Sequence, residues 1–313
     1  MSELREAMER YLALRRGLGF QLREVGANLR NFVSFAEEQG ASHITVDLIL
    51  QWVKERGKAQ PSTQAERVAR VRRFALWLSP FDPRTEVPPE NLLPAKYHRQ
   101  PPYIYKDEEV EQIIRTSAEL PSPHGLRGPT YSTFFGLIAV TGMRMSEAVA
   151  LDRVDVDLEQ GVLTIRRAKF GKTRLVPVHS STRAALQEYS ERRNHLHPRP
   201  TTPAFFLADH GPRITNWSAG YNFAKVSQRI GLRPPTRGRR HGHGPRVHDL
   251  RHRFAVRTLI YWYRTGLDVE REIPKLATYL GHVHVNDTYW YLEAVPELLQ
   301  LATDRVQGEE AHP

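Results

Sequence analysis

Apolar residues recur at every third or fourth position along the first eighty residues of the chain. Between residues 3 and 38 they form two amphipathic stretches, which are separated near the glycines at 17–19. This period is that of a helix with one buried face. A third helix is predicted over 45–58, and a proline at position 61 opens a fourth that runs to about residue 78. We therefore expect a small helical domain at this end of the chain.

A proline-rich segment follows the predicted helices. Residues 79–102 include seven prolines in 24 positions, which is too many for a helix or a central strand. Such linkers are extended and semi-rigid. We place the domain boundary there, with residues 1–95 as a helical domain and residues 96–313 as a second domain. Two domains joined in this way would form a C-shaped clamp around a partner that lies between them.

In the second half of the chain, the apolar residues recur with the spacing of helices in some segments and with that of strands in others. Helices are predicted over 107–116 and 130–140, and a glycine turn at Thr141-Gly142 leads into a new helix from about Met145. From 154 to 178 the period falls to about two, which predicts a three-stranded antiparallel meander. The expected fold class is mainly α, with a helical first domain and a mixed α+β second domain that holds a small antiparallel sheet.

The charge of the chain favours a polyanionic partner. Its 313 residues include 45 Lys and Arg against 35 Asp and Glu, a net charge of +10. Nucleic acid is the leading partner and an anionic membrane surface is the alternative. No apolar run approaches the ~20 residues that span a bilayer, and the first residues lack a signal-peptide pattern. We therefore expect a cytoplasmic protein without a membrane partner.

Two groups of basic side chains are candidates for contacts with a DNA backbone. The predicted helix at 61–78 carries Arg67, Arg70 and Arg73 along one side, and a hairpin turn presents Lys169 and Lys172. The alternative is an ordinary solvated helix face and solubilising lysines. A third basic segment, residues 225–257, contains ten Lys and Arg and one acid, which also indicates a polyanion footprint.

The available side chains limit the chemistry. The chain has no cysteine, which excludes disulfides, thiolate nucleophiles and Cys-based zinc sites. His241 and His243 suggest a metal site as an alternative, but glycines separate them and no carboxylate is near in sequence. We therefore expect no metal, and a nucleophile that is an oxygen atom.

The stretch 247–253 places a histidine and an arginine on one helix face. His248 and Arg251 are three residues apart. A guanidinium binds two oxygens of an anion as a fork, and an imidazole exchanges protons near neutral pH. The pair alone is weak evidence, because a solvated face or a salt bridge has the same spacing.

Several stretches together resemble the tyrosine recombinases of the phage integrase family, close to the Xer-type members with two domains. The matching stretches are Thr141–Glu147, Lys169–Pro177, His248–His252 and Leu280–His282, followed by a tyrosine nine residues after the last histidine. The resemblance implies that the first domain is the family's core-binding, SAM-like domain. It also implies a set of catalytic residues, namely Arg144, Lys169, His248, Arg251, His282 and Tyr291.

The resemblance assigns a role to each of these residues. The two arginines bind the non-bridging oxygens of a phosphodiester, and Tyr291 is the nucleophile. Lys169 is the general acid, His248 transfers a proton, and His282 bonds to a non-bridging oxygen. Tyr289 lies seven residues after His282 rather than nine, and is therefore not the expected nucleophile.

The implied function is site-specific DNA recombination or integration through a 3′-phosphotyrosyl intermediate and a Holliday junction. The implied partners are double-stranded DNA, three further copies of the chain in a synaptic homotetramer, and a partner recombinase in some systems. No cofactor is required, because the phosphotyrosyl bond preserves the energy of the phosphodiester. The alternatives are a mobile-element transposase of the same chemistry, a type IB topoisomerase and a non-catalytic DNA-binding regulator.

Overall fold

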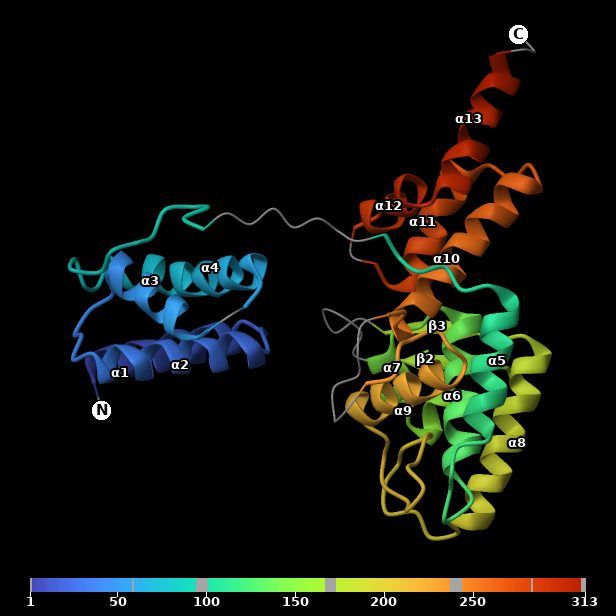
Figure 1. Ribbon diagram of the computed structural model, residues 1–313. Coiled ribbons are helices and arrows are strands. Elements are labelled where there is room, and N and C mark those ends of the chain that lie inside the picture. Colours follow the sequence, from blue (N-terminus) through green and yellow to red (C-terminus); the bar gives the residue numbers. More distant parts are fainter. Residues whose placement is uncertain are drawn as a thin grey trace. The chain divides into compact units, whose positions relative to one another are not determined.

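The computed structural model describes residues 2–57, 59–93, 101–166, 173–236, 244–282 and 284–310 (Figure 1). The chain divides into two compact units, Met1–Gln100 and Pro101–Pro313, which we call the first and the second unit. The boundary predicted at residues 95 and 96 lies outside the described residues.

The first unit consists of four helices that surround one core. They are α1 (Glu3–Gly17), α2 (Arg23–Glu38), α3 (Val46–Glu55) and α4 (Pro61–Leu78). The hydroxyls of Ser2 and Thr45 accept backbone hydrogen bonds at the starts of α1 and α3. The core includes Phe32, Trp52 and Phe74, which are almost fully buried. The predicted helical domain is confirmed, including the interruption after Gly17.

The proline-rich segment differs from the prediction of an extended linker. Val87, Leu92 and Leu93 pack against the core of the first unit. The backbone amide of Glu86 also donates to the carbonyl of Ile44 (2.8 Å). Apolar side chains between the prolines therefore fold this part of the chain back onto the helices, and the residues up to Leu93 belong to the first unit.

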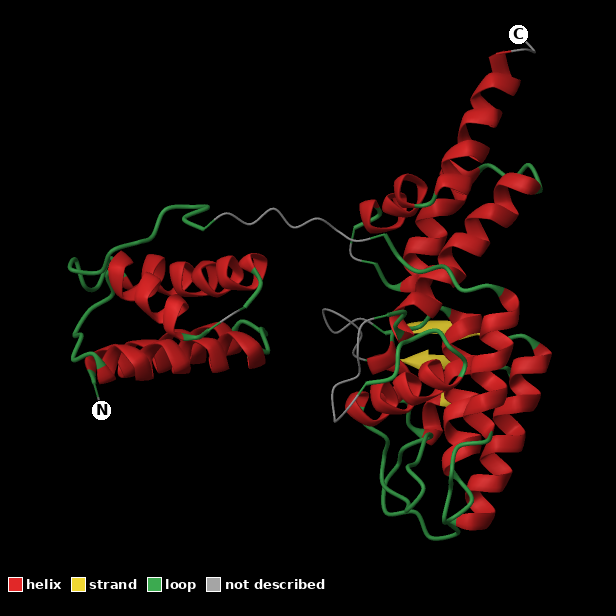
Figure 2. Ribbon diagram, viewed as in Figure 1, coloured by secondary structure: helices red, strands yellow, loops and turns green. Residues whose placement is uncertain are grey.

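The second unit begins with helices that lead to a small sheet. These helices are α5 (Asp107–Ala118), α6 (Arg127–Thr141) and α7 (Met145–Ala150), followed by a 3-10 turn, η1 (Arg153–Asp155). The strands β1 (Val156–Asp157), β2 (Val162–Ile165) and β3 (Arg174–Pro177) are antiparallel in the order β1-β2-β3. Figure 2 draws the strands in yellow. Leu163 pairs with Val156 and Val176. The predicted meander is thus confirmed.

The described residues of the second unit form six more helices. They are α8 (Ser180–Leu196), α9 (Asn216–Arg229), α10 (Val247–Arg264), α11 (Val269–Leu280), α12 (Asn286–Ala294) and α13 (Pro296–Glu310). One core joins α5 to α9, the sheet and the start of α10, and another joins α10 to α13. None of the helices in the described residues is long and apolar enough to cross a membrane.

Candidate active site

The corner between α6 and α7 positions the first candidate arginine. Gly142 ends α6 with φ 62°, a left-handed conformation that glycine adopts without strain. A Cβ atom at this position would lie 2.5 Å from the ring of Phe254 on α10, so the close approach of α10 also requires glycine. Arg144 follows as the N-cap of α7. The glycine turn predicted between these two helices is confirmed.

Arg144 is held from two sides. Its backbone amide and its Nη1 atom donate to the two carboxylate oxygens of Glu147, at 2.9 and 2.8 Å. Its Nη2 atom donates to the carbonyl of Gly281 (2.8 Å), the residue after α11. These bonds fix the guanidinium, while the side chain remains 24% exposed. It can therefore accept an anion without moving far.

A second arginine shares the same carboxylate. Arg174 on β3 donates to both oxygens of Glu147, at 3.0 and 2.7 Å, and to the carbonyl of Tyr279. Burial alone would raise the pKa of Glu147, but the hydrogen bonds from Arg174 and from the Arg144 amide outweigh it and lower the pKa to about 2. Glu147 is therefore ionised at neutral pH and holds two guanidinium groups together.

Arg251 on α10 is the second candidate arginine. Its Nη1 atom donates to the carbonyl of Gly142 and its Nη2 atom to that of Leu280, at 2.8 and 2.9 Å. The residue is only 2% exposed. Burial, and after it the positive charge of Arg144, lowers the pKa of Arg251 to about 10. The fold thus brings the two predicted arginines together, and an anion bound beside them would relieve their repulsion.

The remaining candidates come from the segment after α11. His282 follows the left-handed Gly281, and its Nδ1 atom is 2.7 Å from the hydroxyl of the buried Thr288. Tyr291 on α12 is 1% exposed, and a negative charge on its oxygen would act on Arg251. Tyr289 is 38% exposed. The two tyrosines therefore have different surroundings, as their spacing of two residues on a helix requires.

A residue outside the predicted catalytic set lies at the Tyr291 hydroxyl. The Nδ1 atom of His252 is 2.8 Å from that oxygen. His248 is exposed, and its ring contacts the edge of the His252 ring at 4.6 Å between centroids. His252 and Tyr291 lie on different helices, so their spacing in the sequence gives no sign of this contact. Glu147 and Arg174 were likewise not selected, although both stand in matched stretches.

The candidate DNA-binding residues of α4 differ from one another. Arg73 is exposed and Arg67 is partly buried. Arg70 donates to Glu66 (2.7 Å) and to Glu24 (3.3 Å), which partly neutralise it. The DNA-binding role of these residues stays a prediction. Lys169, Lys172, His241 and His243 lie outside the described residues.

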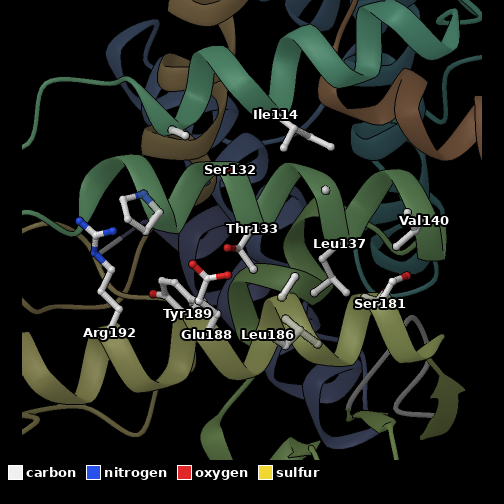
Figure 3. A pocket seen from close by; sticks show the side chains of 15 residues that line it. Ile114, Ser132, Thr133, Leu137, Val140, Ser181, Leu186, Glu188, Tyr189 and Arg192 are labelled. Atoms are coloured by element: carbon white, nitrogen blue, oxygen red, sulfur yellow. The ribbon is translucent and has the colours of Figure 1, made fainter.

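An apolar groove on the second unit is separate from the candidate residues. It lies between α5, α6 and α8 and is lined by side chains such as Ile114, Leu137 and Leu186 (Figure 3). None of the candidate catalytic residues in the described part of the chain lines it. The groove therefore contributes nothing to the arginine cluster.

Comparisons with known proteins identify the family to which the chain belongs. The model of the phage integrase family matches residues 104–297. The chain is 44% identical, over 98% of both sequences, to a protein of Sinorhizobium fredii that carries the name integrase/recombinase y4rB. It is 31% identical to the tyrosine recombinase XerC of Herpetosiphon aurantiacus, over 93% of this chain and 90% of XerC.

Among solved structures, a lambda integrase tetramer bound to a Holliday junction has a similar fold. The TM-score is 0.57 at 16% identity, over 88% of this chain and 76% of the integrase chain. The family model covers more than half of the residues, and the relatives extend over nearly the whole sequence. The chain therefore belongs to the phage integrase family, whose members are tyrosine recombinases.

Proposed function

We propose that this protein is a site-specific DNA recombinase that cleaves and rejoins DNA through a bond between Tyr291 and a 3′-phosphate. The observation that carries the proposal is the convergence of Arg144 and Arg251 beside Tyr291. Two hydrogen bonds orient the Arg251 guanidinium, and the charge of Arg144 and a negative charge formed on the Tyr291 oxygen would both act on it. Fixed cations next to an oxygen nucleophile are what the reaction requires.

The chemistry explains the two arginines. A phosphodiester carries a negative charge that repels a nucleophile, and the five-coordinate transition state spreads charge over the non-bridging oxygens. Arg144 and Arg251 would supply charged forks at those oxygens. His282 would donate to one of the same oxygens. We assign this bond to its Nε2 atom, because its Nδ1 atom lies 2.7 Å from the hydroxyl of Thr288.

The departing 5′ oxygen needs a proton when the strand is cut. We assign this step to Lys169, on the basis of its position in the stretch Lys169–Pro177. The phosphotyrosyl ester keeps the energy of the original bond, so a 5′-hydroxyl can attack it and rejoin the strands without a nucleotide cofactor. Lys172, three residues farther on, would contact the DNA backbone.

The partners follow from the reaction. Exchange of strands between two duplexes uses two cleavages on each, so we propose that four copies of this chain act on double-stranded DNA through a Holliday junction. The lambda integrase structure, a tetramer on such a junction, supports this assembly. A second recombinase could replace two of the copies.

The experiment uses nicked suicide substrates taken from the DNA that flanks the gene. Cleavage releases a short fragment, so the covalent protein-DNA species accumulates. Wild type and Tyr289→Phe should both form a denaturation-resistant adduct. Tyr291→Phe should form none and still shift the same DNA in a gel, because it lacks only the nucleophilic oxygen.

An adduct in Tyr291→Phe, mapped by mass spectrometry to Tyr289, would overturn the assignment. A supercoiled plasmid with one or two recognition sites separates the proposed activity from that of a topoisomerase. Exchange products that require two sites are expected, whereas relaxation without exchange would contradict the proposal.

A further inference from the structure

His252 and Tyr291 form a buried pair beside the arginine cluster. The Nδ1 atom of the histidine and the phenolic oxygen are 2.8 Å apart. The two residues are 6% and 1% exposed. Trp290 and His248 contact the imidazole from other sides, with ring centroids at 5.8 and 4.6 Å. The surroundings therefore hold the imidazole and the hydroxyl at the distance of a good hydrogen bond.

We propose that His252 is the group that takes the proton from Tyr291 when the tyrosine attacks the phosphate. The inference rests on the proposed function, because it needs Tyr291 as the nucleophile. A general base must lie about 2.6–3.2 Å from the proton-bearing atom, and His252 meets this condition. The resemblance gave proton transfer to His248, which is exposed on the preceding turn of α10.

The step balances in both directions. Neutral His252, protonated on Nε2, accepts the hydroxyl proton at Nδ1 and becomes an imidazolium. The bond between the Tyr291 oxygen and phosphorus forms as the bond to the 5′ oxygen breaks, and the general acid protonates that oxygen. In rejoining, a 5′-hydroxyl attacks phosphorus, and His252 returns its proton to the departing Tyr291 oxygen.

The two pKa ranges explain why a base is needed. A phenol has a pKa of about 10 and an imidazole one of about 6.5 in water. At neutral pH the tyrosine alone is almost entirely protonated, whereas a histidine is largely in the neutral form that accepts a proton. Transfer during attack avoids the cost of first forming a free phenolate.

The charges around the pair link proton transfer to the substrate. The titratable groups near His252 include His248 on its own helix and Tyr291 on α12. Arg251 adjoins it in the chain, and the Arg144, Arg174 and Glu147 charges act on Arg251. These groups are three arginines and one carboxylate, so the arginine cluster carries a net positive charge in the free protein. A bound phosphate adds negative charge, so the transfer becomes favourable when DNA is in place.

The test measures single-turnover adduct formation by the full chain on the suicide substrate. His252→Asn keeps a polar group near the position of Nδ1 but cannot accept a proton at neutral pH. We expect its rate to fall by roughly 10²–10³ with unchanged DNA binding. Incorporation of 3,5-difluorotyrosine at position 291, which lowers the phenol pKa, should restore most of the rate in His252→Asn and change wild type little.

His248→Asn is the matched variant. Any loss of rate it shows should not be relieved by the fluorinated tyrosine. Relief there, and none in His252→Asn, would move the base to His248. A rate for His252→Asn equal to or above that of wild type would show that the histidine only holds the tyrosine, and would overturn the proposal.

Two further measurements distinguish failure of the inference from failure of the variant to fold and from failure of the proposed function. If His252→Asn does not fold, the pH profile of wild type decides. If His252 is the base, the acidic limb of the plot of cleavage rate against pH should keep its midpoint when residue 291 is fluorinated. It should move to lower pH if the phenol's own ionisation sets the limb, and that would overturn the inference. Failure of wild type to form any adduct would instead remove the proposed function itself.

Discussion

Glu147 determines where two of the guanidinium groups lie. Its carboxylate accepts hydrogen bonds from Arg144 and Arg174, which come from a helix corner and from a strand. The carboxylate is 8% exposed and the Arg174 side chain 11%. Removing one partner of such a buried pair costs about 3–5 kcal/mol, because the remaining charge is left without compensation.

We expect Glu147→Gln to destabilise the second unit and to slow cleavage. In the folded protein the pKa of this carboxyl is lowered from 4.5 to about 2. Its contribution is therefore fully present above pH 4.5 and is lost as the pH falls through about 2. That shift corresponds to roughly 3 kcal/mol. The urea midpoint of the second unit should fall at pH 7, and variant and wild type should converge toward pH 2.

The matched control is Glu188→Gln, a change at an exposed position of α8. Hydrogen exchange of α7 and β3 distinguishes local loosening from loss of the whole unit. Equal midpoints for the two variants at pH 7 would show that the carboxylate does not hold the arginines.

The resemblance selected Arg144 and Arg251 but not Glu147 or His252, although all four stand in matched stretches. Arg144 and Arg251 meet as expected, although they are far apart in the chain. Glu147 and His252 act through partners on other elements. Such contacts depend on how helices and strands pack, which the period of one element does not reveal. Two buried polar side chains acquire their roles in this way.

Gly281 allows the end of α11 to approach the arginine cluster. Its φ is 68°, and a Cβ atom there would lie 2.8 Å from Nη1 of Arg174 and 3.5 Å from Nη1 of Arg144. Glu147 holds both guanidinium groups, so they cannot move away at low cost. Both the turn after α11 and the positions of the two arginines therefore require a residue without a side chain at position 281.

We predict that Gly281→Ala reduces adduct formation at least tenfold more than Gly266→Ala. Gly266 has nearly the same backbone, with φ 70°, but a Cβ atom there would meet nothing within 4 Å. Both changes should cost about 1–2 kcal/mol of left-handed strain. Single-turnover cleavage measures the difference. If both variants cleave at the same rate, a side chain at position 281 does not displace the arginines, and the prediction is wrong.

The sequence predicts those helices and strands whose apolar residues recur at regular spacing. The four helices of the first unit and the meander were found in this way, and the glycine at 142 marked the corner. Helix α9 was missed because its buried face includes Asn222 and Ser227. Asn222 accepts hydrogen bonds from Arg127. A pattern of apolar residues does not reveal a buried helix face that includes polar side chains.

The net charge of +10 is a property of the whole molecule, and it makes DNA affinity depend on salt. Each phosphate neutralised contributes about −0.9 to the slope of log K against log[salt]. The exposed Arg73 is expected to contact a phosphate, whereas Arg70 is bonded to Glu24 and Glu66.

We therefore expect Arg73→Gln to flatten the slope by about one and Arg70→Gln to change it less. Fluorescence anisotropy of a labelled duplex over a series of salt concentrations measures both slopes. An unchanged slope in Arg73→Gln would mean that this side of α4 does not bind phosphates. A larger change in the slope for Arg70→Gln would mean that Arg70 leaves Glu24 and Glu66 and binds a phosphate when DNA is present.

The burial of Tyr291 has a consequence for the genome that the protein inhabits. A cationic protein spends most of its time on sequences that are not its target, since these outnumber the target by many orders of magnitude. With 1% of Tyr291 exposed, a passing phosphate in random sequence finds no oxygen to react with. We therefore expect DNA that lacks the target to be bound without being cut, because the Tyr291 hydroxyl must become accessible before it can attack a phosphate.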